Sequence, residues 1–198
     1  EIGIVGILRD ITERNRLIEQ LRYNAFHDPL TTLPNRNLFM ERLERLIEHV
    51  KRDKSSSFSV LFLDLDRFKI INDSLGHLSG DKLLILIAKK LTECLRKADT
   101  VSRFGGDEFA ILLHSVDDAF NANFVAERIL EDLKKPFIVN GHKIVISASI
   151  GIVLKGELYN SPEDILRDAD TVMYQAKTLG KARYAIFNRE MHDTAMNF

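Results

Sequence analysis

Residues 58–66, Phe-Ser-Val-Leu-Phe-Leu-Asp-Leu-Asp, decide the fold class of this 198-residue chain. The apolar run 58–63 is typical of a strand covered on both faces. Asp64 and Asp66 follow it directly, although carboxylates rarely enter a core without a partner. Because residues i and i+2 of a strand point the same way, the two carboxylates can face one site. The plainer interpretation is an edge pair that meets solvent, but the end of an inner strand is the usual place for an α/β ligand site.

Helical and strand patterns alternate on both sides of this run. The predicted helices share apolar residues spaced three and four apart, and cover 36–53, 80–97, about 117–134 and 161–180. The predicted strands are short apolar runs bounded by Gly, Asn or Pro, and cover 100–104, 108–113, 136–139, 143–154 and 184–187. Together they predict an α/β (α+β) domain with a mixed central sheet and helices packed around it.

The composition limits the partners. The chain has 28 Lys and Arg against 29 Asp and Glu, a net charge of −1, which argues against a general nucleic-acid binder or direct membrane contact. A small anionic ligand remains compatible with this balance. The single cysteine, Cys94, cannot form an internal disulfide and is expected to be a small core residue. No apolar run approaches the ~20 residues of a membrane span. We expect a cytoplasmic location for this stretch, whether or not a longer parent protein is membrane-attached.

The two ends differ from the rest of the chain. Residues 1–8 are expected to form a strand that ends a preceding domain. Ile11, Ile18 and Ala25 recur at a spacing of seven in the following helix, which stops before Pro29. Two interpretations stay open: an ordinary amphipathic helix, or a linker helix that pairs with its copy in a dimer.

A second acidic feature is the predicted hairpin tip Asp107-Glu108, which follows Gly105-Gly106. A solvated turn is the plain interpretation of such a sequence. If this hairpin pairs beside strand 58–63, however, its carboxylates converge with Asp64, and a divalent cation would relieve their repulsion. Oxygen-only ligands favour Mg²⁺ or Mn²⁺ over zinc.

The stretch after Asp66 is rich in polar residues and glycine and is expected to be a loop. Asn72 and Asp81 offer the donors and acceptors that suit a purine edge. Arg67 and Lys69 could meet phosphates. Taken singly, each is an ordinary loop residue.

Five motifs, which follow one another along the chain in the order typical of the family, resemble the GGDEF family of diguanylate cyclases. They are Phe104-Gly105-Gly106-Asp107-Glu108-Phe109, DLDRFKIINDSLGHLSGD at 64–81, DPLT at 28–31 with LPNR at 33–36, SASIG at 147–151, and the run AD..MYQAK..G at 169–180. The resemblance covers about residues 25–188. It implies a fold similar to nucleotidyl cyclases and polymerase palm domains. It also implies condensation of two GTP molecules into cyclic di-GMP and pyrophosphate across a homodimer of domains.

The same resemblance assigns roles by position. Asp64, Asp107 and the carbonyl of Leu65 would bind Mg²⁺ or Mn²⁺, and Asp107 or Glu108 would help to deprotonate the 3′-hydroxyl. Residues that would bind the substrate are Asn72 and Asp81 at guanine and His77 near the nucleoside. The backbone at Arg67 and Phe68, together with Lys69, Lys177 and Lys181, would hold the phosphates.

Arg96 and Asp99 resemble the RxxD site at which the product inhibits enzymes of this family. The plain alternative is a local ion pair worth about 0.3–0.5 kcal/mol. Two positions depart from the family pattern. Thr32 stands where glycine is usual, and Lys181 stands where arginine is commoner, which keeps the charge but loses the bidentate fork.

The ends also carry resemblances. The stretch GILRDITERN at 6–15 resembles the close of a PAS sensor domain, and FNREMHDTAMNF at 187–198 resembles the stretch that often leads from a GGDEF domain into an EAL phosphodiesterase domain. The expected organisation is therefore a PAS-like end at 1–10, a linker helix at 11–28, the GGDEF domain at 29–188 and a C-terminal linker at 189–198. The first hypothesis is an active cyclase. The alternatives are a catalytically weak GTP-binding domain that controls an attached EAL domain, and a dimerising module with a vestigial cavity.

Overall fold

The computed structural model describes residue 20 and residues 23–53, 56–114, 119–154 and 159–187. The expected strand 1–8, most of the helix 11–28 and the tail 189–198 lie outside the described residues. Residues 23–26 are helical.

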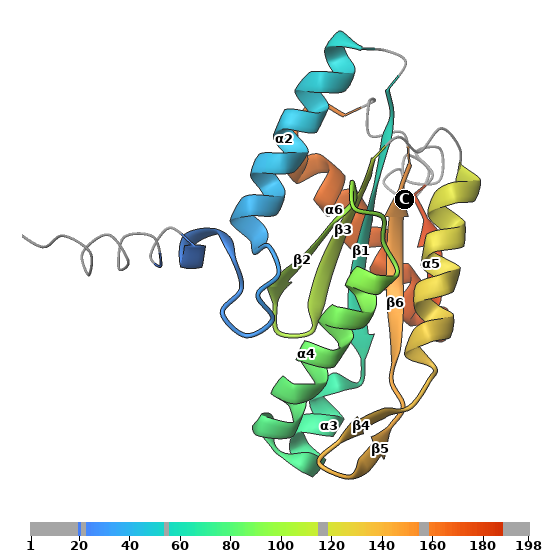
Figure 1. Ribbon diagram of the computed structural model, residues 1–198. Helices are drawn as coiled ribbons and strands as arrows, with labels where there is room; N and C mark the ends of the chain where they lie inside the picture. The colour runs from blue at the N-terminus through green and yellow to red at the C-terminus, as the bar shows by residue number, and fades with distance from the viewer. Residues whose placement is uncertain (1–19, 21–22, 54–55, 115–118, 155–158, 188–198) are drawn as a thin grey trace, which may run out of the picture.

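The described strands form a five-stranded sheet in the order β2-β3-β1-β6-β7 (Figure 1). β1 (Phe58–Asp66) lies in the middle and pairs antiparallel with both β3 (Glu108–His114) and β6 (Ser147–Val153). β2 (Thr100–Gly105) and β7 (Arg183–Ile186) form the edges, and β7 runs parallel to β6. The predicted mixed sheet is confirmed.

Alternate side chains of β1 enter two different cores. Leu61 and Leu63 are fully buried in one core, whereas Val60 and Phe62 are buried in the other. This period of two on a strand buried along its whole length explains why the sequence of β1 is apolar without alternation.

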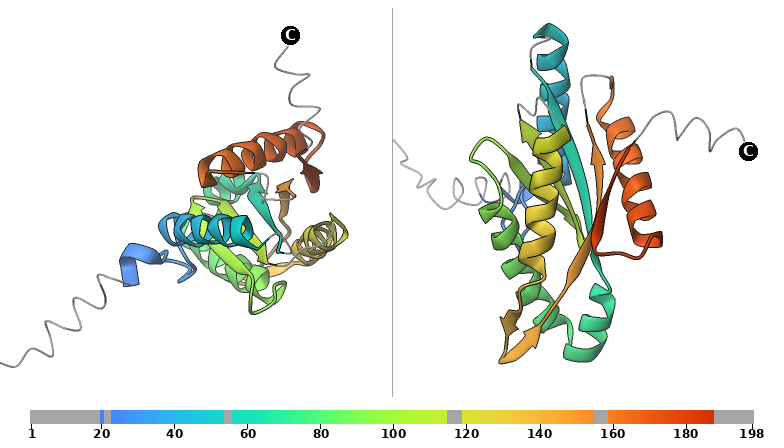
Figure 2. Two further views of the ribbon diagram at one scale, coloured as in Figure 1. Left: turned by 90° about the horizontal axis from the view of Figure 1, so that it is seen from above. Right: turned by 90° about the vertical axis from the view of Figure 1, so that its right-hand side faces the viewer.

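Helices cover both faces of the sheet (Figure 2). α4 (His77–Glu93) and α5 (Ala119–Leu133) pack over the core that contains Leu61. α2 (Arg36–Arg52) and α6 (Pro162–Thr178) pack over the core that contains Phe62. The fold is therefore three layers, with the sheet in the middle.

α6 approaches β6 closely because of a glycine. A Cβ atom at Gly151 would lie 2.0 Å from the carbonyl oxygen of Ala169 and 2.5 Å from the backbone nitrogen of Met173. The start of α6 is fixed by Ser161, whose Oγ accepts a hydrogen bond from the N–H of Asp164 at 3.3 Å. α6 carries Lys177 in its last turn.

The expected loop after Asp66 is wrong. This stretch forms α3 (Phe68–Leu75), and α4 already begins at His77. Phe68, Ile71 and Leu75 lie at helical spacing and pack against the core, although the polar residues between them obscure the pattern. Asn72 and Asp81 are consequently carried by helices rather than by a loop.

The expected strand 143–154 is divided in two. Residues 142–144 form β5 (His142–Ile144), which pairs with β4 (Phe137–Val139) in a separate two-stranded hairpin, and only β6 belongs to the main sheet. The turn between β4 and β5 is formed by Asn140 and Gly141, which have φ angles of 51° and 84°.

Two expectations from the composition can be compared with the structure. Cys94 is buried and its Sγ donates to the carboxylate of Asp132 at 3.4 Å, so the predicted core role is confirmed. Burial and this hydrogen bond raise the pKa of the Cys94 thiol to about 11, so it is an inert thiol at neutral pH. Within the described ranges, no helix is both long and apolar enough to cross a bilayer.

Candidate active site

The register of the sheet brings the acidic residues of two motifs together. Asp64 lies directly opposite Glu108 in the β1–β3 ladder. The N–H of Leu65 donates to the backbone carbonyl of Asp107 at 3.2 Å. The end of β1 and the turn at 105–108, called the GGDEF turn below, therefore present three carboxylates at one end of the central strands.

Asp64 is the most buried of the three and has 9 % of its surface exposed. Burial raises the pKa of its carboxyl, and the nearby charges of Asp107 and Asp66 raise it further. Lys177 acts in the opposite direction, because its Nζ lies 2.8 Å from Oδ2 of Asp64. The lysine expected at the phosphates thus also serves as the counterion of the buried carboxylate.

Glu108 lines a cavity of about 320 Å³, together with Phe104, Asp170 and Arg167. Burial raises the pKa of Glu108, and repulsion from Asp64 and Asp170 adds to that effect. A carboxyl whose pKa lies above its usual range is better suited to accept a proton near neutral pH.

These groups fit a hard divalent cation. The side chains of Asp64 and Asp107 and the main chain of Leu65 offer only oxygen, and the repulsion that raises the pKa of Asp64 is the kind that a cation relieves. Within the described residues, no three His, Cys, Asp or Glu side chains are grouped closely enough to hold a metal alone. Mg²⁺ commonly takes one or two carboxylates and completes its shell with water and substrate phosphates. The donor set therefore suits Mg²⁺ or Mn²⁺ shared with a polyphosphate.

Asp66 does not join this acidic end of the strands as a free carboxylate. Its Oδ1 accepts from the hydroxyl of Ser149 at 2.7 Å. Its Oδ2 accepts from the hydroxyl of Ser147 at 2.6 Å and from the N–H of Ala182 at 3.0 Å. Asp66 is therefore held by β6 and by the α6–β7 loop, and it borders a cavity with Arg67 and Lys181.

The residues expected at guanine lie where α3 meets α4. Asn72 stands in α3 and Asp81 in α4, with the exposed His77 at the start of α4. A Cβ atom on Gly80 would lie 1.8 Å from Oδ1 of Asn72, so glycine is needed here. Oδ1 of Asn72 is buried and has no hydrogen-bond partner among the described residues. An unpaired buried oxygen is costly, which makes Asn72 a candidate to accept a hydrogen bond from a ligand.

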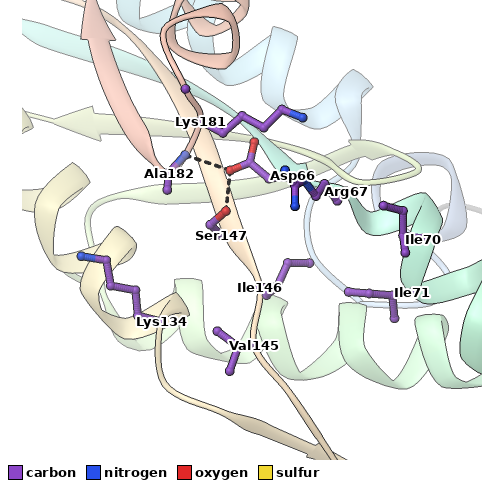
Figure 3. Close-up of a pocket in the computed structure, with 11 residues that line it drawn as sticks. Asp66, Arg67, Ile70, Ile71, Lys134, Val145, Ile146, Ser147, Lys181 and Ala182 are labelled. Carbon is purple, nitrogen blue, oxygen red and sulfur yellow. Dashed lines mark hydrogen bonds between the residues drawn. The ribbon is translucent and has the colours of Figure 1, made fainter.

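Two of the cations expected at the phosphates, Arg67 and Lys181, have a left-handed backbone conformation. Arg67 has a φ of 60° before α3, and Lys181 has a φ of 65° in the α6–β7 loop. Both border a cavity of about 500 Å³ that is also lined by Lys134 (Figure 3). Lys69 is exposed on α3, and the side chain of Phe68 is buried, so Phe68 could meet a ligand only through its backbone.

The side chain of Arg103 forms hydrogen bonds to the GGDEF turn, a role that the sequence patterns do not predict. Its Nε and Nη2 donate to the carbonyl of Gly106 at 3.1 and 2.8 Å. Its Nη1 donates to both carboxylate oxygens of Asp28 at 2.9 and 3.1 Å. The turn that carries Asp107 is thereby tied to the turn at 28–34, to which the backbone bond from Arg103 to Pro34 also contributes at 3.0 Å.

Arg96 and Asp99 lie at the end of the β2–β3 hairpin that is opposite to the turn carrying Asp107. Asp99 accepts from the backbone N–H of Arg96 at 3.0 Å and of His114 at 3.2 Å. The guanidinium of Arg96 makes no ion pair with any described residue, so the local Arg96–Asp99 ion pair weighed above is not formed. Both residues line a cavity of about 60 Å³ that also includes Arg128, a residue that the sequence reading missed.

Comparison with known proteins agrees with this geometry. Residues 25–183 match the model of the family "Diguanylate cyclase, GGDEF domain". The chain is 40% identical over 185 residues to the bifunctional diguanylate cyclase/cyclic di-GMP phosphodiesterase MucR of Pseudomonas aeruginosa. The aligned stretch covers 93% of this chain and 26% of MucR. The chain thus spans about a quarter of that relative.

Solved structures resemble the fold over most of the chain. The GGDEF domain of TpbB (YfiN) from Pseudomonas aeruginosa has a TM-score of 0.78 and 39% identity over 82% of this chain and 94% of that one. The GGDEF domain of DgcB from Caulobacter crescentus, solved with c-di-GMP, has a TM-score of 0.76 and 25% identity over 82% of this chain and 95% of that one. The family match over residues 25–183 and these likenesses show that the chain belongs to the GGDEF family of diguanylate cyclase domains.

Proposed function

We propose that residues 29–188 form an active diguanylate cyclase domain, which joins two GTP molecules into cyclic di-GMP and releases pyrophosphate. The observation that carries this proposal is the convergence of Asp64, Asp107 and Glu108 at one end of the central strands, with Lys177 2.8 Å from Asp64. A domain that only bound a partner would have no need of three repelling carboxylates at one place.

Each domain would hold one GTP. Asn72 and Asp81 would read the guanine edge, and the unpaired Oδ1 of Asn72 would accept from its N–H groups. Arg67, Lys69 and Lys181 would neutralise the phosphates. Asp64, Asp107 and the carbonyl of Leu65 would hold Mg²⁺ or Mn²⁺, which neutralises the triphosphate and lowers the pKa of the attacking hydroxyl.

The reaction needs two such domains facing each other. The 3′-oxygen of one GTP bonds to the α-phosphorus of the other, and the bond from that phosphorus to pyrophosphate breaks. Asp107 or Glu108 takes the proton of the hydroxyl. Glu108 suits this role because burial and Asp64 raise its pKa.

We also propose that cyclic di-GMP inhibits the domain at Arg96 and Asp99. The guanidinium of Arg96 is free to bind a guanine edge or a phosphate in a bidentate way. Arg128 borders the same cavity and adds a second guanidinium. The DgcB structure with c-di-GMP supports product binding by a domain of this fold.

The test is synthesis of cyclic di-GMP by the chain fused to a dimerising coiled coil, with GTP and Mg²⁺. Product is expected from the wild type and none from Asp107→Ala, whose fold should be intact by circular dichroism. Saturable GTP binding by the enforced dimer without product would contradict the proposal. It would favour a GTP-binding regulatory domain, a second candidate that the bifunctional relative MucR makes reasonable.

A further inference from the structure

We propose that Asp66 is a positioning residue for the triphosphate, because it holds the α6–β7 loop and thereby Lys181 in place. This inference rests on the proposed function. It gives Asp66 a role different from that of Asp64, although the two carboxylates are separated by one residue of the same strand.

The carboxylate of Asp66 gathers donors from two separate segments. Ser147 and Ser149 of β6 donate to it through their hydroxyls at 2.6 and 2.7 Å, and Ala182 donates through its backbone N–H at 3.0 Å (Figure 3 shows the bonds from Ser147 and Ala182). The residue is only 6 % exposed. Three of the roughly four acceptor positions of the carboxylate are therefore occupied by protein donors, and a hydrogen bond to a buried charged group is stronger than one between neutral groups.

The loop held in this way has an unfavourable backbone. Lys181 and Ala182 are consecutive left-handed residues with φ angles of 65° and 51°, after Gly180 with a φ of 118°. Residues with a Cβ atom persist in this conformation only where the surroundings hold them. The bond from the N–H of Ala182 to Asp66 is such a restraint, and it acts on the residue next to Lys181.

The conformation places a free cation beside the cavity of about 500 Å³. The side chain of Lys181 makes no ion pair with any described residue, and it borders this cavity together with Arg67, which directly follows Asp66. Asp66 therefore links the two cationic segments, because Arg67 directly follows it and the N–H of Ala182 donates to it. A loop released from Asp66 could relax toward ordinary φ values, and Lys181 would then leave this position.

The experiment is a double-mutant cycle on nucleotide affinity. Wild type, Asp66→Ala, Lys181→Ala and the double variant are titrated calorimetrically with α,β-methylene-GTP, which cannot release pyrophosphate, and with GMP. If Asp66 acts through Lys181, Asp66→Ala lowers the affinity for the analogue about tenfold in the wild-type background. In the Lys181→Ala background the same substitution causes no further loss of affinity. GMP affinity changes less than about twofold. Equal losses in both backgrounds, or equal losses for the analogue and GMP, would overturn the inference.

Ser149→Ala is the matched control, because it removes one hydrogen bond to the same carboxylate but leaves the bond to Ala182. It is expected to lower stability and to keep the affinity for the analogue. Asp66→Asn is the conservative rescue: its oxygen can still accept from Ala182 while its amide donates to the hydroxyl of Ser149, so affinity returns to within about twofold. If Ser149→Ala lowers the affinity for the analogue as much as Asp66→Ala does, the inference is overturned.

If Asp66→Ala does not fold, Asp66→Ser replaces it, because the shorter side chain stays polar but cannot reach Ala182. A folded wild type that binds neither nucleotide contradicts the proposed function itself. A wild type that binds the analogue as tightly as its folded Asp66→Ala or Asp66→Ser variant contradicts only the role of Asp66.

Discussion

The Nζ atom of Lys177 lies 2.8 Å from Oδ2 of Asp64, so the end of α6 provides the counterion for the most buried carboxylate of the site. Burial raises the pKa of this carboxyl and the charges of Asp107 and Asp66 raise it further, whereas Lys177 lowers it. The pairing also holds the ammonium at the end of the strands where a cation and a triphosphate would meet. Removing either partner therefore changes the titration of the site as well as its charge.

The first prediction concerns the pH dependence of turnover. Metal binding needs the ionised form of Asp64, whose pKa is raised, so kcat/KM for GTP should begin to fall at a pH above that expected for an ordinary aspartate. Lys177→Met removes the group that lowers this pKa, so the acid limb of the profile should move to higher pH. Lys51→Met, on an exposed position of α2, should leave it unchanged. An acid limb at the same pH in wild type and Lys177→Met would refute the assignment.

The second prediction concerns stability at the acidic end of the central strands. The folded-state pKa of Glu108 is raised, so its ionised form is disfavoured in the folded protein, and the free energy of unfolding falls as pH rises through that pKa. Glu108→Gln should therefore be more stable than wild type at pH 7, and this difference should vanish near pH 4. Urea unfolding at both pH values measures it. Glu44→Gln on the exposed face of α2 serves as the control, and an equal gain there would argue against a specific effect.

The parts of the fold and site that sequence predicts are those encoded by neighbouring residues. The apolar run before Asp64 predicts the central strand, and Gly105-Gly106 predicts the hairpin that brings Glu108 opposite Asp64. The helix α3 was missed because Phe68, Ile71 and Leu75 alternate with polar residues. The break before β6 was missed because both sides of it are apolar.

Contacts between distant residues could not be predicted in this way. The donors to Asp66 lie 81, 83 and 116 residues away in the sequence. Asp28 and Arg103 are 75 residues apart. No local pattern distinguishes Asp66, which these donors hold, from Asp64, whose carboxylate pairs with Lys177 instead. Only the packing of β6 and the α6–β7 loop against β1 separates their roles.

The third prediction concerns the ion pair of Asp28 and Arg103, whose side chains are 15% and 10% exposed. Burial tends to raise the pKa of Asp28, but hydrogen bonds from Thr31 and Arg103 outweigh it, and the pKa is lowered. The stabilisation is therefore present at neutral pH and is lost as pH falls below the ordinary value of 3.8. Asp28→Asn should lose about 2 kcal/mol at pH 7, between the values for exposed and buried pairs. The difference from wild type should shrink in acid, and a constant difference in urea unfolding would contradict the charge-based explanation.

The fourth prediction separates the two RxxD residues. Asp99→Ala leaves two backbone N–H groups without their acceptor and should lower the free energy of unfolding by about 1–2 kcal/mol. Arg96→Ala removes a side chain without an ion pair, so stability should change by less than about 0.5 kcal/mol. Both variants should lose inhibition by cyclic di-GMP, measured as initial GTP turnover with added product. Inhibition of Arg96→Ala at wild-type strength would refute the effector role.

The fifth prediction concerns Thr32, which stands where the family usually has glycine. Its φ of 61° is left-handed, a conformation that costs a residue with a Cβ atom about 1–2 kcal/mol. Glycine relieves this strain, but its flexibility in the unfolded chain offsets about 0.5–1 kcal/mol. Thr32→Gly should therefore be more stable than Thr32→Ala by about 0.5–1 kcal/mol in urea unfolding. Thr32→Ala keeps the Cβ atom and loses the same hydroxyl bond to the carbonyl of Thr31, so it should give no gain. Equal stability of the glycine and alanine variants would show that backbone strain at this turn is not what glycine relieves.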